Sequence, residues 1–191
     1  GVVTATILSS ESVAELATLN SDGGINVFNI VIGVADATSS TAGQFNAINA
    51  AVSSSVIIDL GNVTALAGST LADLGTLATA INNNEFSNAS GLTTIALTDT
   101  TIDATTLAAR ITSYDAINGV GATTGMTLAS GATINVDAGE ITAMLADETA
   151  GRLTIGDQAI TVNSAATISV DTANLLAATT TGVVTASITT S

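Results

Sequence analysis

The sequence lacks several residue types that protein chemistry depends on. It has no cysteine, histidine, proline or tryptophan, and its only basic side chains are Arg110 and Arg152. Without cysteine, neither a disulfide nor a thiolate metal site can form. Without histidine and lysine as well, the usual nucleophile–base pairs and imidazole metal sites cannot be assembled. We therefore predict that the chain is not an enzyme, and we assign no catalytic, cofactor-binding or metal-ligating residues.

Positive charge is scarce, whereas negative charge is abundant. Sixteen acidic residues against two basic ones give a net charge of −14. A chain with so few cations cannot neutralise a phosphate backbone, so nucleic acid is excluded as a partner. Oxygen ligands abound, and Ca²⁺ is the ion they would suit, although no spacing like that of an EF-hand loop is present.

Aromatic residues and long apolar runs are also in short supply. The aromatic residues are Phe28, Phe45, Phe86 and Tyr114, yet 47% of the chain is hydrophobic. Burial must therefore come from aliphatic side chains and alanine in thin, regular layers. The sequence has no uninterrupted apolar run of about 18 residues, and no basic segment stands before an apolar one. We therefore expect neither a membrane span nor a signal peptide in these residues.

A seven-residue sequence near the start returns near the end. Residues 1–7 recur as residues 182–188, a displacement of 181, with six of seven positions identical and Thr6 replaced by Ser187. We expect residues 1–181 to be one tandem-repeat unit and residues 182–191 to be the start of the next.

Shorter recurrences divide the interior of this unit. Strand-like starts follow one another at Val2, Ile25, Val56, Leu92, Met126, Leu153 and Val183. Period-2 alternation is clearest over 153–155, 159–162 and 167–170. Between such runs, apolar residues recur at helical spacing, as in Leu71, Leu74, Leu77 and Ile81.

These recurrences predict a mainly β fold. We expect a right-handed β-solenoid with open ends, in which about six coils of roughly 30 residues each carry a short helix of two or three turns. Segments 82–88 and 119–122 are predicted to be loops that project from the stack.

Polar residues mark the predicted helix starts. Ser12 with Glu15, and Asp137 with Glu140, have the spacing of a capping box, and Asp103 and Asp171 stand in similar places.

Carboxylate pairs are the remaining route to chemistry. Glycoside hydrolysis needs two carboxylates, and the candidate pairs are Asp99 with Asp103, Asp137 with Glu140, and Asp147 with Glu148. Each pair also has a structural explanation in helix capping or a solvated turn, and we favour that explanation.

Calcium binding and ice binding are two further alternatives. Calcium would be sought at Asp22, at Asp157 and at Asp147 with Glu148, although scattered surface carboxylates are the favoured interpretation. Ice binding would need threonine rows such as Thr4 and Thr6, but other segments do not repeat that phase, and the β-propensity of threonine explains the rest.

Two short patterns resemble those of a known class of proteins. Residues 170–175 (Val-Asp-Thr-Ala-Asn-Leu), and residues 34–38 followed by 45–49, are similar to motifs of giant secreted tandem-repeat bacterial cell-surface proteins, of adhesin, matrix or surface-coat type, found in cyanobacteria and other aquatic bacteria. The calcium-binding nonapeptide common in that class is missing, and residues 21–24 are its nearest approach.

The resemblance and the repeat together predict a structural role. We expect a repeat unit of an extracellular fibre, cell-surface filament or adhesin stalk, assembled by end-to-end stacking of solenoid coils. Its partners would be neighbouring copies of the same repeat, joined covalently or head to tail, with other filaments or surface polysaccharide as further candidates. The alternatives are a discrete subunit that polymerises by strand addition, or a calcium- or carbohydrate-binding adhesin domain.

Overall fold

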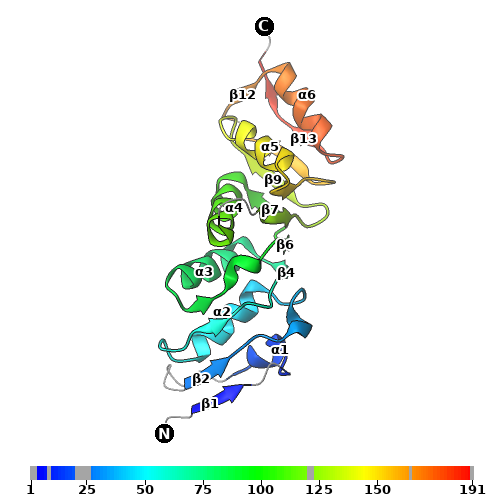
Figure 1. The fold of residues 1–191 in the computed structure, drawn as a ribbon. Helices are drawn as coiled ribbons and strands as arrows, with labels where there is room; N and C mark the ends of the chain where they lie inside the picture. Colours follow the sequence, from blue (N-terminus) through cyan, green and yellow to red (C-terminus); the bar gives the residue numbers. More distant parts are fainter. Residues whose placement is uncertain (1–3, 8–9, 20–26, 120–122, 164, 190–191) are drawn as a thin grey trace.

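The chain folds into an elongated array of short parallel strands and helices that runs from the N-terminus to the C-terminus (Figure 1). This computed structural model describes residues 4–7, 10–19, 27–119, 123–163 and 165–189. Its secondary structure is 39% helical and 24% strand. The fold class is therefore mixed α/β.

The helices within the described residues are α1 (Val13–Leu16), α2 (Ala42–Ala51), α3 (Leu71–Asn82), α4 (Ala104–Asn118), α5 (Ile141–Thr149) and α6 (Val170–Thr179), with 3₁₀ turns η1 (Val34–Asp36) and η2 (Ala89–Gly91). The strands are β1 (Thr4–Ile7), β2 (Val27–Ile30), β3 (Ile58–Asp59), β4 (Ala65–Ser69), β5 (Phe86–Ser87), β6 (Thr94–Leu97), β7 (Thr101–Asp103), β8 (Gly125–Thr127), β9 (Thr133–Val136), β10 (Leu153–Thr154), β11 (Ala159–Val162), β12 (Thr167–Ile168), β13 (Val184–Thr185) and β14 (Ser187–Ile188).

The strands pair in parallel and lie in several separate sheets. Two sheets have four strands each, in the orders β10-β8-β6-β4 and β13-β11-β9-β7, and the others are the pairs β1-β2, β3-β5 and β12-β14. Paired residues are between 20 positions apart, as for Thr167 and Ser187, and 32 positions apart, as for Ile102 and Ile134. Parallel strands need a crossover of this length, and the helices supply much of it.

The predicted fold class is wrong. The chain is not a mainly β solenoid of about six coils, because helix exceeds strand, 39% against 24%, and the separate sheets do not close into a solenoid. Two of the helices are also longer than the two or three turns expected: α3 has 12 residues and α4 has 15.

Threonine favours strands by propensity, but this preference does not exclude it from the helices of this chain. Many threonines instead lie on helices, where the hydroxyl donates a hydrogen bond to the carbonyl four residues earlier. Thr79 bonds Gly75 in α3 at 2.9 Å, and Thr112 bonds Ala108 in α4 at 2.9 Å. This local bond satisfies the hydroxyl within the helix, so β-propensity alone does not decide the conformation.

The strand starts themselves are predicted well. Strands β1, β2, β3, β6, β8, β10 and β13 each begin within two residues of a predicted start. Of the two expected projecting loops, segment 82–88 instead ends α3 and forms β5, and residues 120–122 of the other lie outside the described residues.

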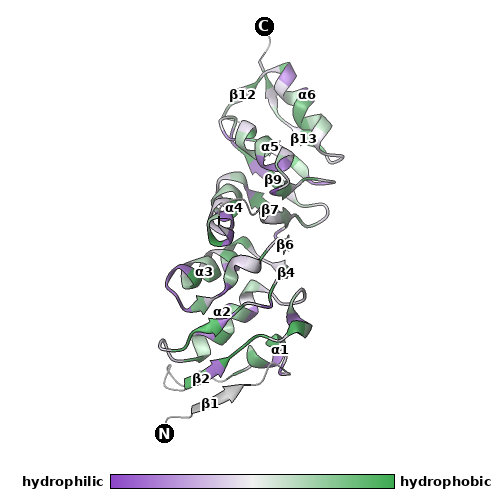
Figure 2. Cartoon of the chain, viewed as in Figure 1, coloured by the Kyte–Doolittle hydropathy of each residue, from purple (hydrophilic) through white to green (hydrophobic). Residues whose placement is uncertain are grey.

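The core is a thin aliphatic layer that runs the length of the array. Its buried residues form one cluster from Val13 in α1 to Leu176 in α6. Apolar positions recur on the helices and strands along the whole molecule (Figure 2). Aromatic residues add two local anchors: Phe45 and Phe86 meet edge to face at 6.3 Å between ring centres, and Tyr114 is fully buried.

Candidate functional site

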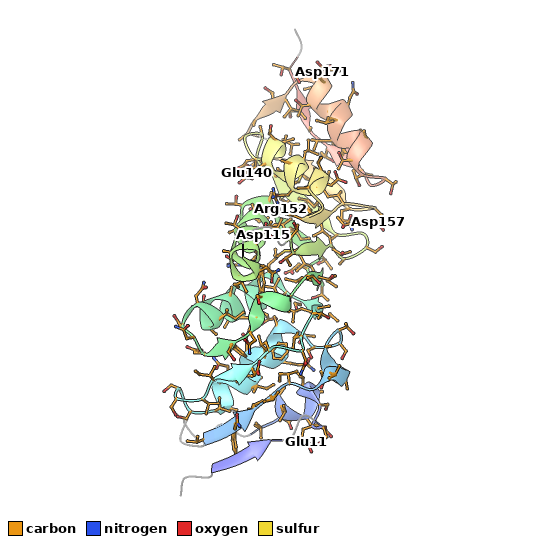
Figure 3. All side chains as sticks on the ribbon, in the orientation of Figure 1. Glu11, Asp115, Glu140, Arg152, Asp157 and Asp171 are labelled. Carbon is orange, nitrogen blue, oxygen red and sulfur yellow. The ribbon has the colours of Figure 1, made fainter. Side chains whose placement is uncertain are left out.

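The acidic residues considered as candidates are spread along the array. Figure 3 labels three of them, Glu140, Asp157 and Asp171, together with Glu11 near the N-terminal end and Asp115 in the middle of the array. Among the described residues, no three acidic side chains come close enough to hold a metal ion together. The candidate carboxylates must therefore be considered one by one.

Asp99 and Asp103 both serve helix starts. A carboxylate oxygen of Asp99 accepts a hydrogen bond from the backbone amide of Leu71, the first residue of α3, at 2.9 Å. Asp103 is the N-cap of α4 and accepts from the amide of Thr106 at 2.8 Å and from its hydroxyl at 2.9 Å. These bonds lower the pKa of Asp103 below its ordinary value. The two carboxylates thus cap different helices.

Asp137 and Glu140 lie together, but their roles differ from those predicted. Glu140, not Asp137, is the N-cap residue of α5, and its side chain accepts from the amide of Asp137 at 3.0 Å and from the hydroxyl of Thr105. The carboxylate of Asp137 accepts from the side-chain amide of Asn163 at 2.9 Å. Both groups therefore join neighbouring strand–helix segments.

Of two further cap predictions, one is confirmed and one is wrong. Ser12 and Glu15 form the predicted capping box at the start of α1. Asp171 does not open its helix: α6 begins one residue earlier, with Ser169 as N-cap, and Asp171 lies in the first turn.

Asp147 is engaged by one of the two arginines. The guanidinium of Arg152 contacts Asp147 at 2.7 Å and lies 3.8 Å from Asp115. Glu148, the other member of the predicted pair, follows Asp147 on α5, so the two side chains point in different directions around the helix. The pair does not form a two-carboxylate catalytic arrangement.

Asp157 lies in the turn between β10 and β11. Its carboxylate accepts from the Ser130 hydroxyl at 2.5 Å and from the Gly131 amide at 3.2 Å, and these bonds lower the pKa of Asp157. Asp22 and the segment 21–24 lie outside the described residues.

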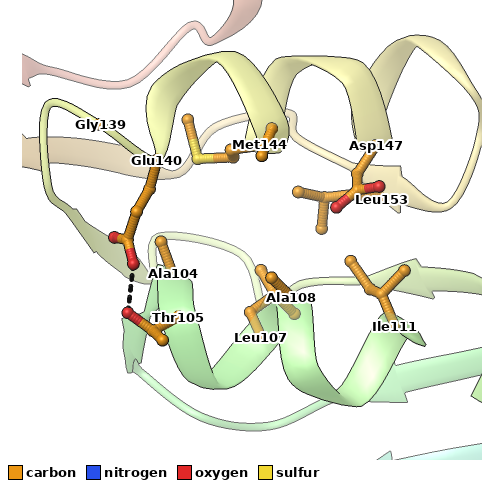
Figure 4. A pocket seen from close by; sticks show the side chains of 11 residues that line it. Ala104, Thr105, Leu107, Ala108, Ile111, Gly139, Glu140, Met144, Asp147 and Leu153 are labelled. Atoms are coloured by element: carbon orange, nitrogen blue, oxygen red, sulfur yellow. Dashed lines mark hydrogen bonds between the residues drawn. The ribbon is translucent and has the colours of Figure 1, made fainter. Parts of the chain in front are cut away.

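An apolar hollow of about 200 Å³ separates α4 from α5 (Figure 4). Leu107 and Ile111 line one wall and Met144 and Leu153 the other, with Glu140 and Asp147 also among the lining residues. Both carboxylates are already occupied, Glu140 by Thr105 and Asp147 by Arg152. The hollow therefore has apolar walls and no free acid or base that could act on a ligand.

A pattern that sequence analysis missed joins each of the first three helices to the following segment. The first amide of α1, α2 and α3 donates to a side chain that lies 23, 27 or 28 residues later. The pairs are Val13 with Asp36 at 3.2 Å, Ala42 with Ser69 at 2.9 Å, and Leu71 with Asp99 at 2.9 Å. Because these amides have no partner within their own helix, the next segment completes each helix start.

The two ends of the array present unpaired strand edges. Among the described residues, β1 pairs only with β2, while β13 and β14 pair only with β11 and β12. The C-terminal end also exposes large apolar side chains, with exposed fractions of 72% for Val183, 41% for Ile188, 57% for Val170 and 54% for Leu175. Such edges are templates for pairing with another strand, so this end is the candidate interaction surface.

Comparisons with known proteins give no identification. No protein-family model, no curated protein and no solved structure matches the chain. In the described part of the chain, every helix is too short or too polar to cross a bilayer. The interaction surface is therefore the feature on which a functional argument can rest.

Proposed function

We propose that this chain is a structural unit of an extracellular or cell-surface filament, in which copies of the unit are joined end to end. The observation that supports this most directly is the pair of unpaired strand edges at opposite ends of an elongated parallel array (Figure 1). In this role the chain performs no catalysis, and its partners are further copies of itself.

The packing suits a mechanical role. The aliphatic core is continuous along the array, and the starts of α1, α2 and α3 are completed by the segment that follows. Each segment therefore depends mainly on its neighbours, as in other repetitive architectures. Adding a further copy would cover an edge that is otherwise prone to nonspecific association.

The charge and composition of the chain are compatible with a location outside the cell or on its surface. The net charge is −14, and the chain has no cysteine to be oxidised. Self-repulsion of this size is screened in salty surroundings, so copies of the chain can lie next to one another there. The likeness to giant bacterial surface proteins in residues 34–38, 45–49 and 170–175 adds to the proposal.

The proposal is tested by the denatured mass and the shape of the native polypeptide taken from its source. A mass many times 18.6 kDa, together with filaments in electron micrographs, is the expected result. A compact particle built from one chain of about 18.6 kDa would refute the proposal.

A further inference from the structure

The repeated sequence forms a strand at each end of the array, and the two copies are paired along different edges. Residues 4–7 form β1, and the matching residues 185–188 fall in β13 and β14. Strand β1 is paired with the segment that follows it, β2, whereas β13 and β14 are paired with the segments that precede them, β11 and β12. Together, the two copies of the sequence show both edges of one strand in use.

The two registers fit together without a shift. Ser187 pairs with Thr167, and its counterpart Thr6 pairs with Asn29. One residue later, Ile188 pairs with Ile168, and its counterpart Ile7 pairs with Ile30. A single strand could therefore satisfy both neighbours at once.

The inward and outward faces of the strands agree as well. Ile168 and Ile30 are buried, with exposed fractions of 5% and 0%, while Thr167, Ser187 and Asn29 are exposed. A one-residue error in register would reverse these faces. Ile188, in line with the two buried isoleucines, is 41% exposed because only one side of it is covered.

We propose that residues 182–188 serve as the first strand of a second copy of this unit, so that strand β2 of that copy pairs directly with them. This inference rests on the proposed function and specifies the joint, that is, the contact between two successive copies. The copy that follows in the same polypeptide is the favoured occupant, because a separate chain would already cover its own β2 with its own β1.

Charge at the joint favours a second copy over other partners. The chain carries a net charge of −14, yet residues 1–10, 27–30 and 182–191 contain no charged side chain. Two copies can therefore approach at this point without the repulsion that opposes contact elsewhere.

Helix α6 provides a second contact for the same partner. It exposes Val170 and Leu175 at the C-terminal end of the row of helices (Figure 1). Along the array, α1, α2, α3 and α4 each pack against the next helix. In a second copy joined in this way, α1 would be the next helix after α6.

The experiment uses a two-copy protein in which residue 181 is followed directly by residue 1 of a complete second chain. Because the chain has no cysteine, two introduced cysteines can report one strand pair. The junction variant carries Thr167→Cys in the first copy and Thr6→Cys in the second. The companion variant carries Thr6→Cys and Asn29→Cys, both in the second copy.

Geometry sets the expected result. Facing residues of paired strands have Cα atoms roughly 4.8 Å apart, within the span of a disulfide, and a shift of two residues adds about 6.6 Å along the strand. Both variants should therefore cross-link on mild oxidation, as completely as the single chain carrying Thr167→Cys and Ser187→Cys. A matched control with Thr167→Cys and Thr4→Cys should stay reduced.

A companion pair that closes while the junction pair stays reduced would overturn the inference, because the first strand would then belong to its own unit alone. Cross-linking of the shifted control instead of the junction pair would overturn the register. Hydrogen exchange gives a second measurement without cysteine: the amides of the shared strand should exchange at least about tenfold more slowly in the two-copy protein than at residues 182–188 of the single chain. Equal rates would refute the joint.

These outcomes are separate from those of the proposed function. The cross-links report how two joined copies pair, whereas the mass and shape of the native material report whether copies are joined at all. Native filaments together with a failed junction pair would leave the function standing and remove this joint.

Discussion

Tyr114 offers a sharp test of the packing between α3 and α4. It is fully buried on α4, and its hydroxyl donates a hydrogen bond to the carbonyl of Leu74 on α3 at 3.2 Å. Burial raises the pKa of Tyr114 above the ordinary tyrosine value, and the charge of Arg110 opposes this only in part. It is also the only tyrosine, in a chain without lysine or cysteine.

Stability should consequently fall in alkaline solution through this one side chain. The folded state keeps Tyr114 neutral, while the unfolded chain ionises above pH of about 10. The stabilisation is therefore complete below that pH and is lost as pH rises above it, by about 1.4 kcal/mol for each further pH unit. At about pH 12, the free energy of unfolding should be lower by roughly 3 kcal/mol.

The control is Tyr114→Phe, which keeps the ring but cannot ionise. Loss of the hydrogen bond should lower the free energy of unfolding by about 1 kcal/mol at neutral pH. The variant should then hold its stability in alkali, so the two stability curves should cross near pH of about 10.7. Urea unfolding followed by circular dichroism at several pH values measures both curves.

Absorbance provides the refuting result. If the native protein shows tyrosinate absorbance with a midpoint at pH of about 10, the ring is accessible to solvent and the packing described for α4 is incorrect.

Three further substitutions test other contacts. Asp99→Ala removes the acceptor for the first amide of α3 and should lower the free energy of unfolding by about 1 kcal/mol; an unchanged urea midpoint would contradict the capping role. Gly182→Ala places a methyl group 2.4 Å from the carbonyl oxygen of Gln158, so β13 should detach and its amides should exchange faster. Gly139→Ala, where a methyl group meets nothing within 4 Å, is the matched control and should leave exchange unchanged. Arg152→Met breaks an ion pair that is one-third exposed, so it should lower stability by less than about 1 kcal/mol, and by less still in high salt; a larger loss that ignores salt would argue against a surface pair.

Local order along the chain could be predicted from the sequence because it follows from periodicity. Strand starts near Leu92 and Leu153 and the capping box at Ser12 depend only on residues a few positions apart. The fold class could not be predicted in this way. The helix start at Asp103 could be predicted, but the 15-residue length of α4 depends on the burial of Leu107 and Tyr114 against other segments.

Only one part of the candidate interaction surface could be predicted from the sequence. The recurrence of residues 1–7 at 182–188 could be found by inspection. Which edge of each copy is paired could not, because that depends on partners 20 or more residues away. The same distance hid the contact of Val13 with Asp36, whose donor is a backbone amide that leaves no trace in residue type.

The helix starts that are completed by later segments imply an order of folding along the chain. During synthesis, α1 emerges before Asp36, and α3 emerges 28 residues before Asp99. Each of these first helices therefore keeps an unsatisfied amide until the following segment has been made. A polypeptide built this way would consolidate in order behind its leading end, with only the newest segment left incomplete.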